Sequence, residues 1–266
     1  MLTINGQTTG SDRPMLVGDG TNLYITAAQF GISTSGYFGT ESWVIGDTAG
    51  PGGGLYNGGT LTVTANQLMP SNQGVFSVAA SGGGKTYYAS DYSSGGQILL
   101  ALQTYDKATN TFGAISTLSL GNIDQGGAYT VQQKGTSLLL DAVDNRIANI
   151  VYSNGFLYGV SDMKPSGSSV PLVHWFKVDV SNPNAPALVA QGDISGASIG
   201  TNVATFNSSI AVDAAGDVLI NFTASGPNNY PSDYYVFQGA GDPTGSFSAP
   251  IQIGRASCRE RVFRAV

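Results

Sequence analysis

One pattern recurs along this chain and constrains its fold more than any other feature: an apolar strand, a tight turn with glycine, and a second apolar strand. The four copies lie at Met15–Ile25, Val75–Ala89, Ile150–Val160 and Ile210–Ile220. Their turn glycines, at positions 20, 82, 155 and 216, are separated by 62, 73 and 61 residues. Recurrence at this period predicts a repeat protein in which each unit stacks on the next.

A second pair of strands follows the first in each repeat. Ser42–Asp47 resembles His174–Asp179, and the tryptophans in these segments are 132 residues apart, which is about two repeats. Segments 98–106 and 234–237 occupy the equivalent positions. The closing hairpin is clearest in Val178–Gly192, where an Asn/Pro turn separates two strands. Four strands per unit are typical of a propeller blade.

The fold class predicted from these repeats is all-β, a partial β-propeller of about four blades with four antiparallel strands each. No helical apolar pattern persists over 11 residues. The repeat is too short for a string of β-sandwich domains and too long for a coil of a parallel β-helix. Blades usually have about 40 to 50 residues, so we expect long loops at Pro51–Gly59 and Gly226–Asp233.

Turn chemistry agrees with this assignment. Asn154 and Gly155 suit the two central positions of a type I′ hairpin, which both need φ > 0. Asp213 and Asp217 bracket a longer loop, where aspartate side chains can accept hydrogen bonds from nearby backbone.

The composition changes abruptly near Gly254. Two arginines precede this point and four follow it, together with the only cysteine, Cys258. Residues 253–262 resemble a translated sequencing-library adapter. We therefore expect a propeller at 1–252, truncated at one or both ends, and a non-native tail at 253–266. Four blades are few for a closed ring. We therefore expect this segment to pack against the remaining blades of a longer parent chain.

Charge and composition exclude several classes of protein. Without the tail the chain has seven basic and 16 acidic residues, a net charge of −9, and no cysteine. An acidic body without a Lys/Arg cluster argues against nucleic acids and anionic membranes as partners. The sequence has no run of about 18 apolar residues, so no transmembrane helix is predicted. The start, Met1–Gly6, does not read as a signal peptide, so we expect the natural N-terminus to be missing.

No catalytic set is recognisable in the sequence, and the prediction is no catalytic residue, no metal ligand and no cofactor. Hydrolytic triads and zinc sites generally need histidine, and the lone His174 is expected to be an outward or capping strand residue. Calcium is the alternative cofactor, although no spacing matches an EF-hand loop. A retaining glycosidase needs two carboxylates, but turns explain most of the available aspartates, which are Asp141, Asp144, Asp162, Asp179, Asp193, Asp213 and Asp217.

Aromatic side chains offer a second type of binding group. In strands with alternating burial they more often pack between blades than stack on sugars, and packing is the interpretation we favour. The residues concerned are Tyr152, Tyr158, Trp175, Tyr234 and Tyr235.

The two arginines of the body form the most specific coincidence. Arg13 and Arg146 are 133 residues apart, and each lies shortly before the first strand of a repeat, with Asp12 or Asp144 just upstream. If that strand is the innermost of its blade, both pairs lie near one mouth of the central channel. One interpretation is a structural Asp–Arg pair that ties adjacent blades. The other is an arginine rim that binds a carboxylate or sulfate of an acidic glycan.

Segments 144–158, 173–179 and 191–194 are similar to propeller repeats of large bacterial secreted or cell-surface proteins of mostly unassigned function. That resemblance implies secretion or cell-surface placement and a scaffold or adhesion role.

The predicted function is a non-enzymatic extracellular binding or adhesion module whose partner is a glycan or a protein surface. The first alternative is a propeller-type glycoside hydrolase or lyase that acts on acidic glycans, with catalytic residues partly outside this chain. The second alternative is a structural spacer. The predicted ligand-binding residues are Arg13, Arg146, Asp12, Asp144 and Trp175.

Overall fold

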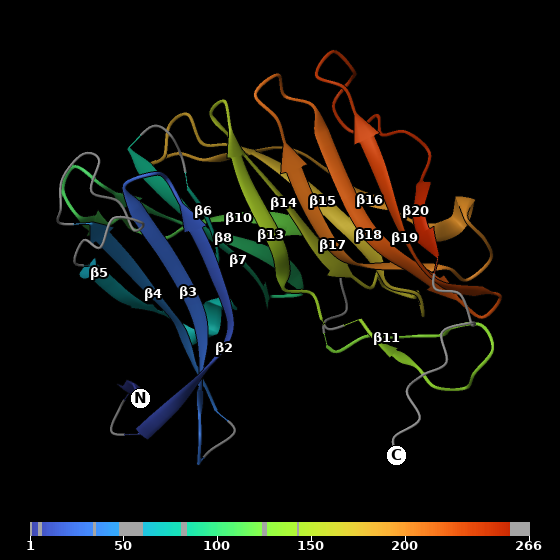
Figure 1. Cartoon of the computed structure of the whole chain (residues 1–266), viewed down its shortest axis with the longest axis horizontal. Coiled ribbons are helices and arrows are strands. Elements are labelled where there is room, and N and C mark those ends of the chain that lie inside the picture. Colours follow the sequence, from blue (N-terminus) through green and yellow to red (C-terminus); the bar gives the residue numbers. More distant parts are fainter. Residues whose placement is uncertain are drawn as a thin grey trace.

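The computed structural model describes residues 2–4, 7–33, 36–47, 61–80, 84–123, 127–142 and 144–255. Its described strands form four larger antiparallel sheets that follow one another in chain order, and one small two-stranded sheet. Figure 1 shows these sheets fanned side by side, from the first sheet in blue to the fourth in orange and red. The predicted all-β propeller with about four four-stranded blades is confirmed, and we number the blades 1 to 4.

The strands of each blade are consecutive in the sequence. Blade 1 contains β1 (Leu2–Ile4), β2 (Gln7–Gly18), β3 (Asn22–Gly31), β4 (Tyr37–Asp47) and β5 (Leu61–Met69). Blade 2 contains β6 (Ser77–Ala80), β7 (Lys85–Ser94), β8 (Gln97–Asp106), the short β9 (Thr111–Phe112) and β10 (Ser116–Gly121). Blade 3 contains β13 (Ile147–Ser153), β14 (Phe156–Met163), β15 (Leu172–Asp179) and β16 (Ala187–Ile194). Blade 4 contains β17 (Ala204–Val212), β18 (Val218–Gly226), β19 (Asn229–Gln238) and β20 (Ile251–Arg255).

Each strand buries alternate side chains because the side-chain period of a strand is two. In β18, Val218, Ile220 and Phe222 are buried against blade 3, whereas Leu219 and Asn221 point away from it. Equivalent apolar clusters join blade 2 to blade 3 and blade 1 to blade 2. Full burial of one such side chain stabilises the fold by about 1.5 to 3 kcal/mol. The blades are therefore held together mainly through their sheet faces.

Aromatic residues contribute to these interfaces as expected. Tyr87 of β7 stacks on Tyr152 of β13 with ring centroids 5.4 Å apart. Trp175 and Tyr158 belong to the cluster between blades 3 and 4, and Tyr234 packs against the same cluster. Packing between blades is thus confirmed for these residues.

The hairpin turns also follow the sequence chemistry. Asn154 has φ 50° and Gly155 has φ 85°, as a type I′ turn requires. The Asp213 Oδ1 accepts hydrogen bonds from the backbone N–H groups of Ala215, Gly216 and Asp217 at 2.9 Å each. Both turns were predictable because asparagine, aspartate and glycine supply what the backbone needs locally.

The expected position of one long loop was wrong. Residues 226–233 form the tight turn and paired ends of β18 and β19 instead of a loop. The extra length lies between β10 and β13, where a small hairpin of β11 (Thr130–Val131) and β12 (Leu140–Asp141) crosses to blade 4 (Figure 1). There the Ser225 Oγ donates a hydrogen bond to the Gln132 carbonyl at 2.9 Å. The other expected loop, at 51–59, lies outside the described residues.

β20 continues past the domain boundary that composition suggested at 252. Gly254 and Arg255 pair with Asp233 and Ser232 of β19. The sheet therefore extends to Arg255, while residues 256–266 lie outside the described part of the chain.

The outer faces of blades 1 and 4 expose apolar side chains. Leu16 of β2 is 65% exposed, and Ile253 of β20 is 63% exposed. No described strand covers either face. Within the described residues, no helix has the length and apolarity needed to span a membrane.

A glycine tests the packing inside blade 3. A Cβ at Gly159 would lie 2.2 to 2.8 Å from ring atoms of the buried Phe176, which pairs with it across β14 and β15. We expect Gly159→Ala to lower the free energy of unfolding by about 1 to 3 kcal/mol, because overpacking a core costs that much. The measurement is chemical denaturation.

Gly241→Ala is the matched control, since its Cβ would meet no atom within 4 Å. That change is expected to stay within about 0.5 kcal/mol of the parent. Equal stability of the two variants would contradict the packing described for Phe176.

Candidate functional site

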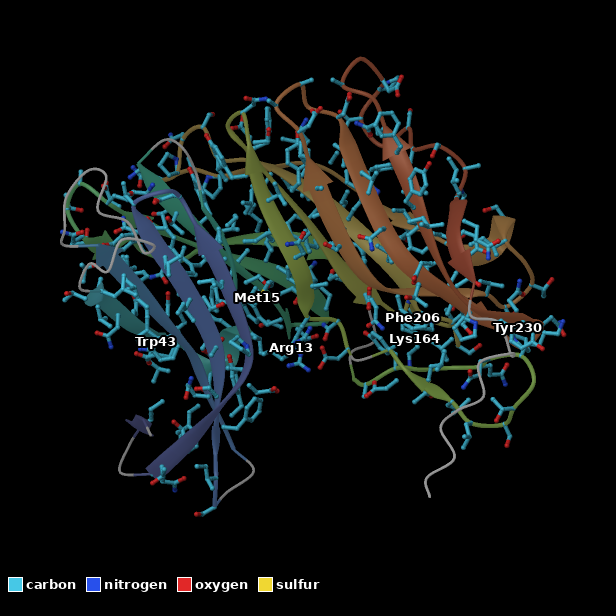
Figure 2. The ribbon with its side chains drawn as sticks, viewed as in Figure 1. Arg13, Met15, Trp43, Lys164, Phe206 and Tyr230 are labelled. Carbon is cyan, nitrogen blue, oxygen red and sulfur yellow. The ribbon has the colours of Figure 1, made fainter. Side chains whose placement is uncertain are left out.

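A pocket of about 230 Å³ lies where the first strands of blades 1, 3 and 4 approach one another. Figure 2 shows Arg13 on the side of blade 1 that faces the rest of the propeller. The pocket, which we call the central pocket, is lined by Arg13, Asp144, Arg146, Ala148, Asp162, Asn207 and Ser208.

Irregular pairing in the first strands of these blades delivers side chains to the central pocket. The register shifts between Asp12 and Met15 in β2, between Ile147 and Asn149 in β13, and between Phe206 and Ser209 in β17. A β-bulge bends its strand and reorients the side chain at that point. β-Bulges at equivalent places in β2, β13 and β17 therefore form the central pocket.

Arg13 has two features that distinguish it from an ordinary surface arginine. Its φ is 49°, a left-handed conformation that is uncommon for residues other than glycine, asparagine and aspartate. Its Nη1 is buried and has no hydrogen-bond partner among the described residues. Leaving such a donor unpaired costs about 1 to 3 kcal/mol, and more for a charged group. A strained backbone and a buried donor without a partner make Arg13 a candidate functional residue.

Arg146 is held by its own segment. Asp144 Oδ1 accepts hydrogen bonds from the backbone N of Arg146 at 3.1 Å and from its Nε at 2.7 Å. These contacts leave the two terminal guanidinium nitrogens outside the pair. The pair lies within three residues of sequence, so it does not tie adjacent blades as the structural interpretation required. Asp12 likewise makes a local contact, to the backbone N of Arg13 at 2.9 Å.

Asp162 is the third acidic residue near these arginines, and it joins blade 3 to blade 4. Its side chain is on β14, and the residue is 4% exposed. Its Oδ2 accepts from the backbone N of Asn207 at 2.7 Å, and its Oδ1 accepts from the Ser208 Oγ at 3.1 Å. The carboxylate therefore satisfies backbone and side-chain donors at the bulge of β17.

Burial raises the pKa of Asp162 to about 6, because a charge is costly in an apolar interior. The hydrogen bonds from Asn207 and Ser208 and the positive charge of Arg13 act in the opposite direction, but burial is the larger effect. The central pocket thus contains a carboxyl group that changes charge close to neutral pH.

The structure brings together three of the five residues predicted to bind a ligand, namely Arg13, Asp144 and Arg146. Asp12 is exposed beside Arg13 and does not line the pocket. Trp175 lies elsewhere, in a pocket between blades 3 and 4.

Sequence reasoning missed the roles of Asp162, Asn207 and Ser208. Asp162 was grouped with aspartates that turns mostly explain, yet it lies within a strand. A usable signal was present: Ser161–Asp162 repeats Ser90–Asp91 at the same place in the second strand of the neighbouring blade. A carboxylate inside an otherwise apolar strand is rarely buried without a partner.

The expectation for His174 was wrong. The residue is neither outward nor capping, because it is 2% exposed on the face of blade 3 that packs toward blade 2. Its Nδ1 lies 2.7 Å from Asp193 Oδ1 and its Nε2 lies 3.3 Å from Gln191 Oε1. Gln191 in turn donates to the Leu120 carbonyl of blade 2 at 3.2 Å. His174 is part of the contact between blades.

Asp179, Asp213 and Asp217 serve turns as predicted, whereas Asp141 and Asp193 lie in the strands β12 and β16. Asp179 accepts from the backbone N and the Oγ of Ser181, and these bonds lower its pKa. Among the described residues, no group of three or more His, Cys, Asp or Glu side chains is placed to hold a metal ion.

No protein-family model matches the chain, and no curated protein matches it. Solved structures with a similar arrangement of strands include a thermostable family-43 glycoside hydrolase, with 13% identity, a TM-score of 0.41, and coverage of 95% of this chain and 75% of that one. A GH43_12 protein from a capybara gut metagenome has 9% identity and a TM-score of 0.41, with coverage of 87% and 40%. A glycoside hydrolase has 8% identity and a TM-score of 0.42, with coverage of 91% and 76%. At these values the similarity says nothing about the activity of this chain.

The raised pKa of Asp162 has a consequence for stability. The folded protein holds this proton up to about pH 6, whereas the unfolded chain releases it near pH 3.8. Between these values the folded state binds more protons, so stability falls as pH rises. We expect the unfolding free energy of the wild type, relative to Asp162→Asn, to fall by about 2 kcal/mol from pH 4 to pH 6.5.

Chemical denaturation of both proteins across this range measures the difference. A difference that is independent of pH, or that grows with pH, would contradict the buried environment of Asp162.

Proposed function

We propose that this propeller binds an acidic glycan, with the carboxylate or sulfate of one sugar held in the central pocket. The observation that carries the proposal is the buried Nη1 of Arg13, which has no hydrogen-bond partner among the described residues, in a pocket that also contains Arg146. A buried donor of this kind needs an acceptor, and the guanidinium geometry suits carboxylate and sulfate.

The charges in the pocket support an anionic ligand. Asp144 already has a hydrogen-bond partner in Arg146, so its charge is largely offset. Asp162 is directed at the donors of β17, and its pKa of about 6 leaves it partly protonated in mildly acidic solution. Arg13 forms no ion pair within 4.0 Å among the described residues, so its positive charge is available to an anion.

The size of the pocket limits what enters it. About 230 Å³ is less than the usual range for drug-sized ligands, which starts near 300 Å³. The pocket therefore suits one charged group or one sugar unit, and the rest of a polymer would lie outside it. A role in adhesion at the cell surface or after secretion fits such recognition and forms part of the proposal.

Replacing Arg146 tests the binding site without disturbing the core. We expect Arg146→Ala to weaken the binding of a polyuronate or sulfated oligosaccharide at least tenfold, which is about 1.4 kcal/mol, with a melting temperature close to that of the parent. Calorimetric titration and a melting curve measure the two quantities.

Lys85→Ala is the control, because it removes the same charge from a half-buried pair with Asp106 in a hairpin of blade 2. Equal binding by all three proteins would contradict an arginine site. A lowered melting temperature with unchanged binding would instead assign Arg146 a structural role.

Glycoside hydrolysis is the second candidate, and Asp162 is the observation that favours it. A carboxyl group with a pKa of about 6 can donate a proton near neutral pH, and Asp144 is a second carboxylate in the same pocket. Against this, both Asp162 oxygens already accept hydrogen bonds from β17. Release of reducing ends from acidic polysaccharides, lost in Asp162→Asn, would favour the enzyme.

A further inference from the structure

Trp175 lines a second pocket, distinct from the central one. Its volume is about 400 Å³, and it lies between the outer strand of blade 3 and the 239–250 segment of blade 4. We call it the rim pocket. Its lining includes Trp175, Gly192, Thr244, Gly245, Phe247 and Ser248.

The indole of Trp175 lines the rim pocket, and the residue is 7% exposed. Its Nε1 does not belong to the fully buried polar atoms that lack a partner. The N–H of a tryptophan is a hydrogen-bond donor, so a hydroxyl oxygen of a molecule bound in the pocket can accept from it.

Two glycines keep the edge of this indole clear. A Cβ on Gly192 would lie 3.0 Å from the Trp175 Nε1, and a Cβ on Gly245 would lie 3.2 Å from its Cζ2. Phe247 packs edge-on against the indole, with ring centroids 5.4 Å apart and an angle of 68°. The pocket thus combines an aromatic wall with space beside a polar N–H.

The remaining lining is polar but carries no positive charge. Thr244 and Ser248 contribute hydroxyl groups, and β16 contributes backbone and the carboxylate of Asp193, whose Oδ1 lies 2.7 Å from His174 Nδ1. No lysine or arginine is among the described residues of the lining. An apolar wall with a few hydroxyl and backbone partners is typical of a small-molecule site that recognises uncharged polar groups.

We propose that the rim pocket binds an uncharged sugar unit, with a hydroxyl oxygen of the sugar accepting a hydrogen bond from the Trp175 Nε1–H. The site is separate from the central pocket and does not depend on the ligand proposed there. A glycan bound at both places would gain affinity from the second contact.

The chain has two tryptophans, which makes the pocket directly observable. In a Trp43→Phe protein the fluorescence reports Trp175 alone. We expect titration with neutral hexasaccharides of glucose, xylose, arabinose and mannose to give a saturable change in emission with at least one of them. The reciprocal Trp175→Phe protein, in which only Trp43 emits, is expected to show no change with that sugar.

Gly192→Ala, made in the Trp43→Phe protein, places a methyl group against the indole Nε1 and is expected to weaken the response at least tenfold. Thr244→Ala is a milder second variant, should Gly192→Ala lower the melting temperature. Arg146→Ala is expected to leave the response unchanged, which separates this site from the central pocket. Absence of a saturable change with every sugar, or full binding in both Gly192→Ala and Thr244→Ala proteins that remain folded, overturns the proposal.

Discussion

The packing of one sheet face on the next is the interaction on which the rest of this structure depends. Strands that bury every second residue leave a four-stranded sheet with two faces to cover, and successive sheets cover them for one another. Phe176 and Val178 face blade 2, while Val173 and Trp175 of the same strand face blade 4. Because a strand alternates strictly, one blade contributes to two cores at once.

The central pocket arises where this regular packing is interrupted. Bulges in β2, β13 and β17 break the pairing at the same level of three blades, and they turn polar side chains toward one another. Asp162 compensates at one of these breaks, since its carboxylate accepts the backbone donor that the bulge at Asn207 leaves free. The proposed binding site and the hydrogen bonds that stabilise the bulge therefore involve the same few residues, and these hydrogen bonds explain why a buried carboxylate is tolerated there.

Much of the fold was predictable because its turns and strands are specified by short stretches of sequence. Asn154–Gly155 and Asp213 specify their turns through backbone conformation and short-range hydrogen bonds, and the alternation of apolar residues marks the strands. Arg13 and Arg146 could be placed together because the repeat puts equivalent strands at equivalent radii. By contrast, the partner of Asp162 is 45 residues away, and the hairpin that crosses to blade 4 does not follow the repeat. Contacts of that kind depend on how blades meet, which a local pattern does not report.

The central pocket and the rim pocket offer different chemistry to a ligand. The central pocket offers arginine donors, and the rim pocket offers an indole N–H beside hydroxyl groups. Composition alone draws attention to these pockets only through arginine and tryptophan, which are scarce in this chain. The exposed outer faces of blades 1 and 4 remain as apolar surfaces on which a further sheet could pack.

The most direct test of the central claim is a crystal structure determined with glucuronate present. The account predicts that the sugar carboxylate lies within hydrogen-bond distance of the Arg13 Nη1, with a guanidinium nitrogen of Arg146 on its other side. An Arg13 Nη1 bonded to protein in a closed pocket, with glucuronate absent or bound elsewhere, would contradict it.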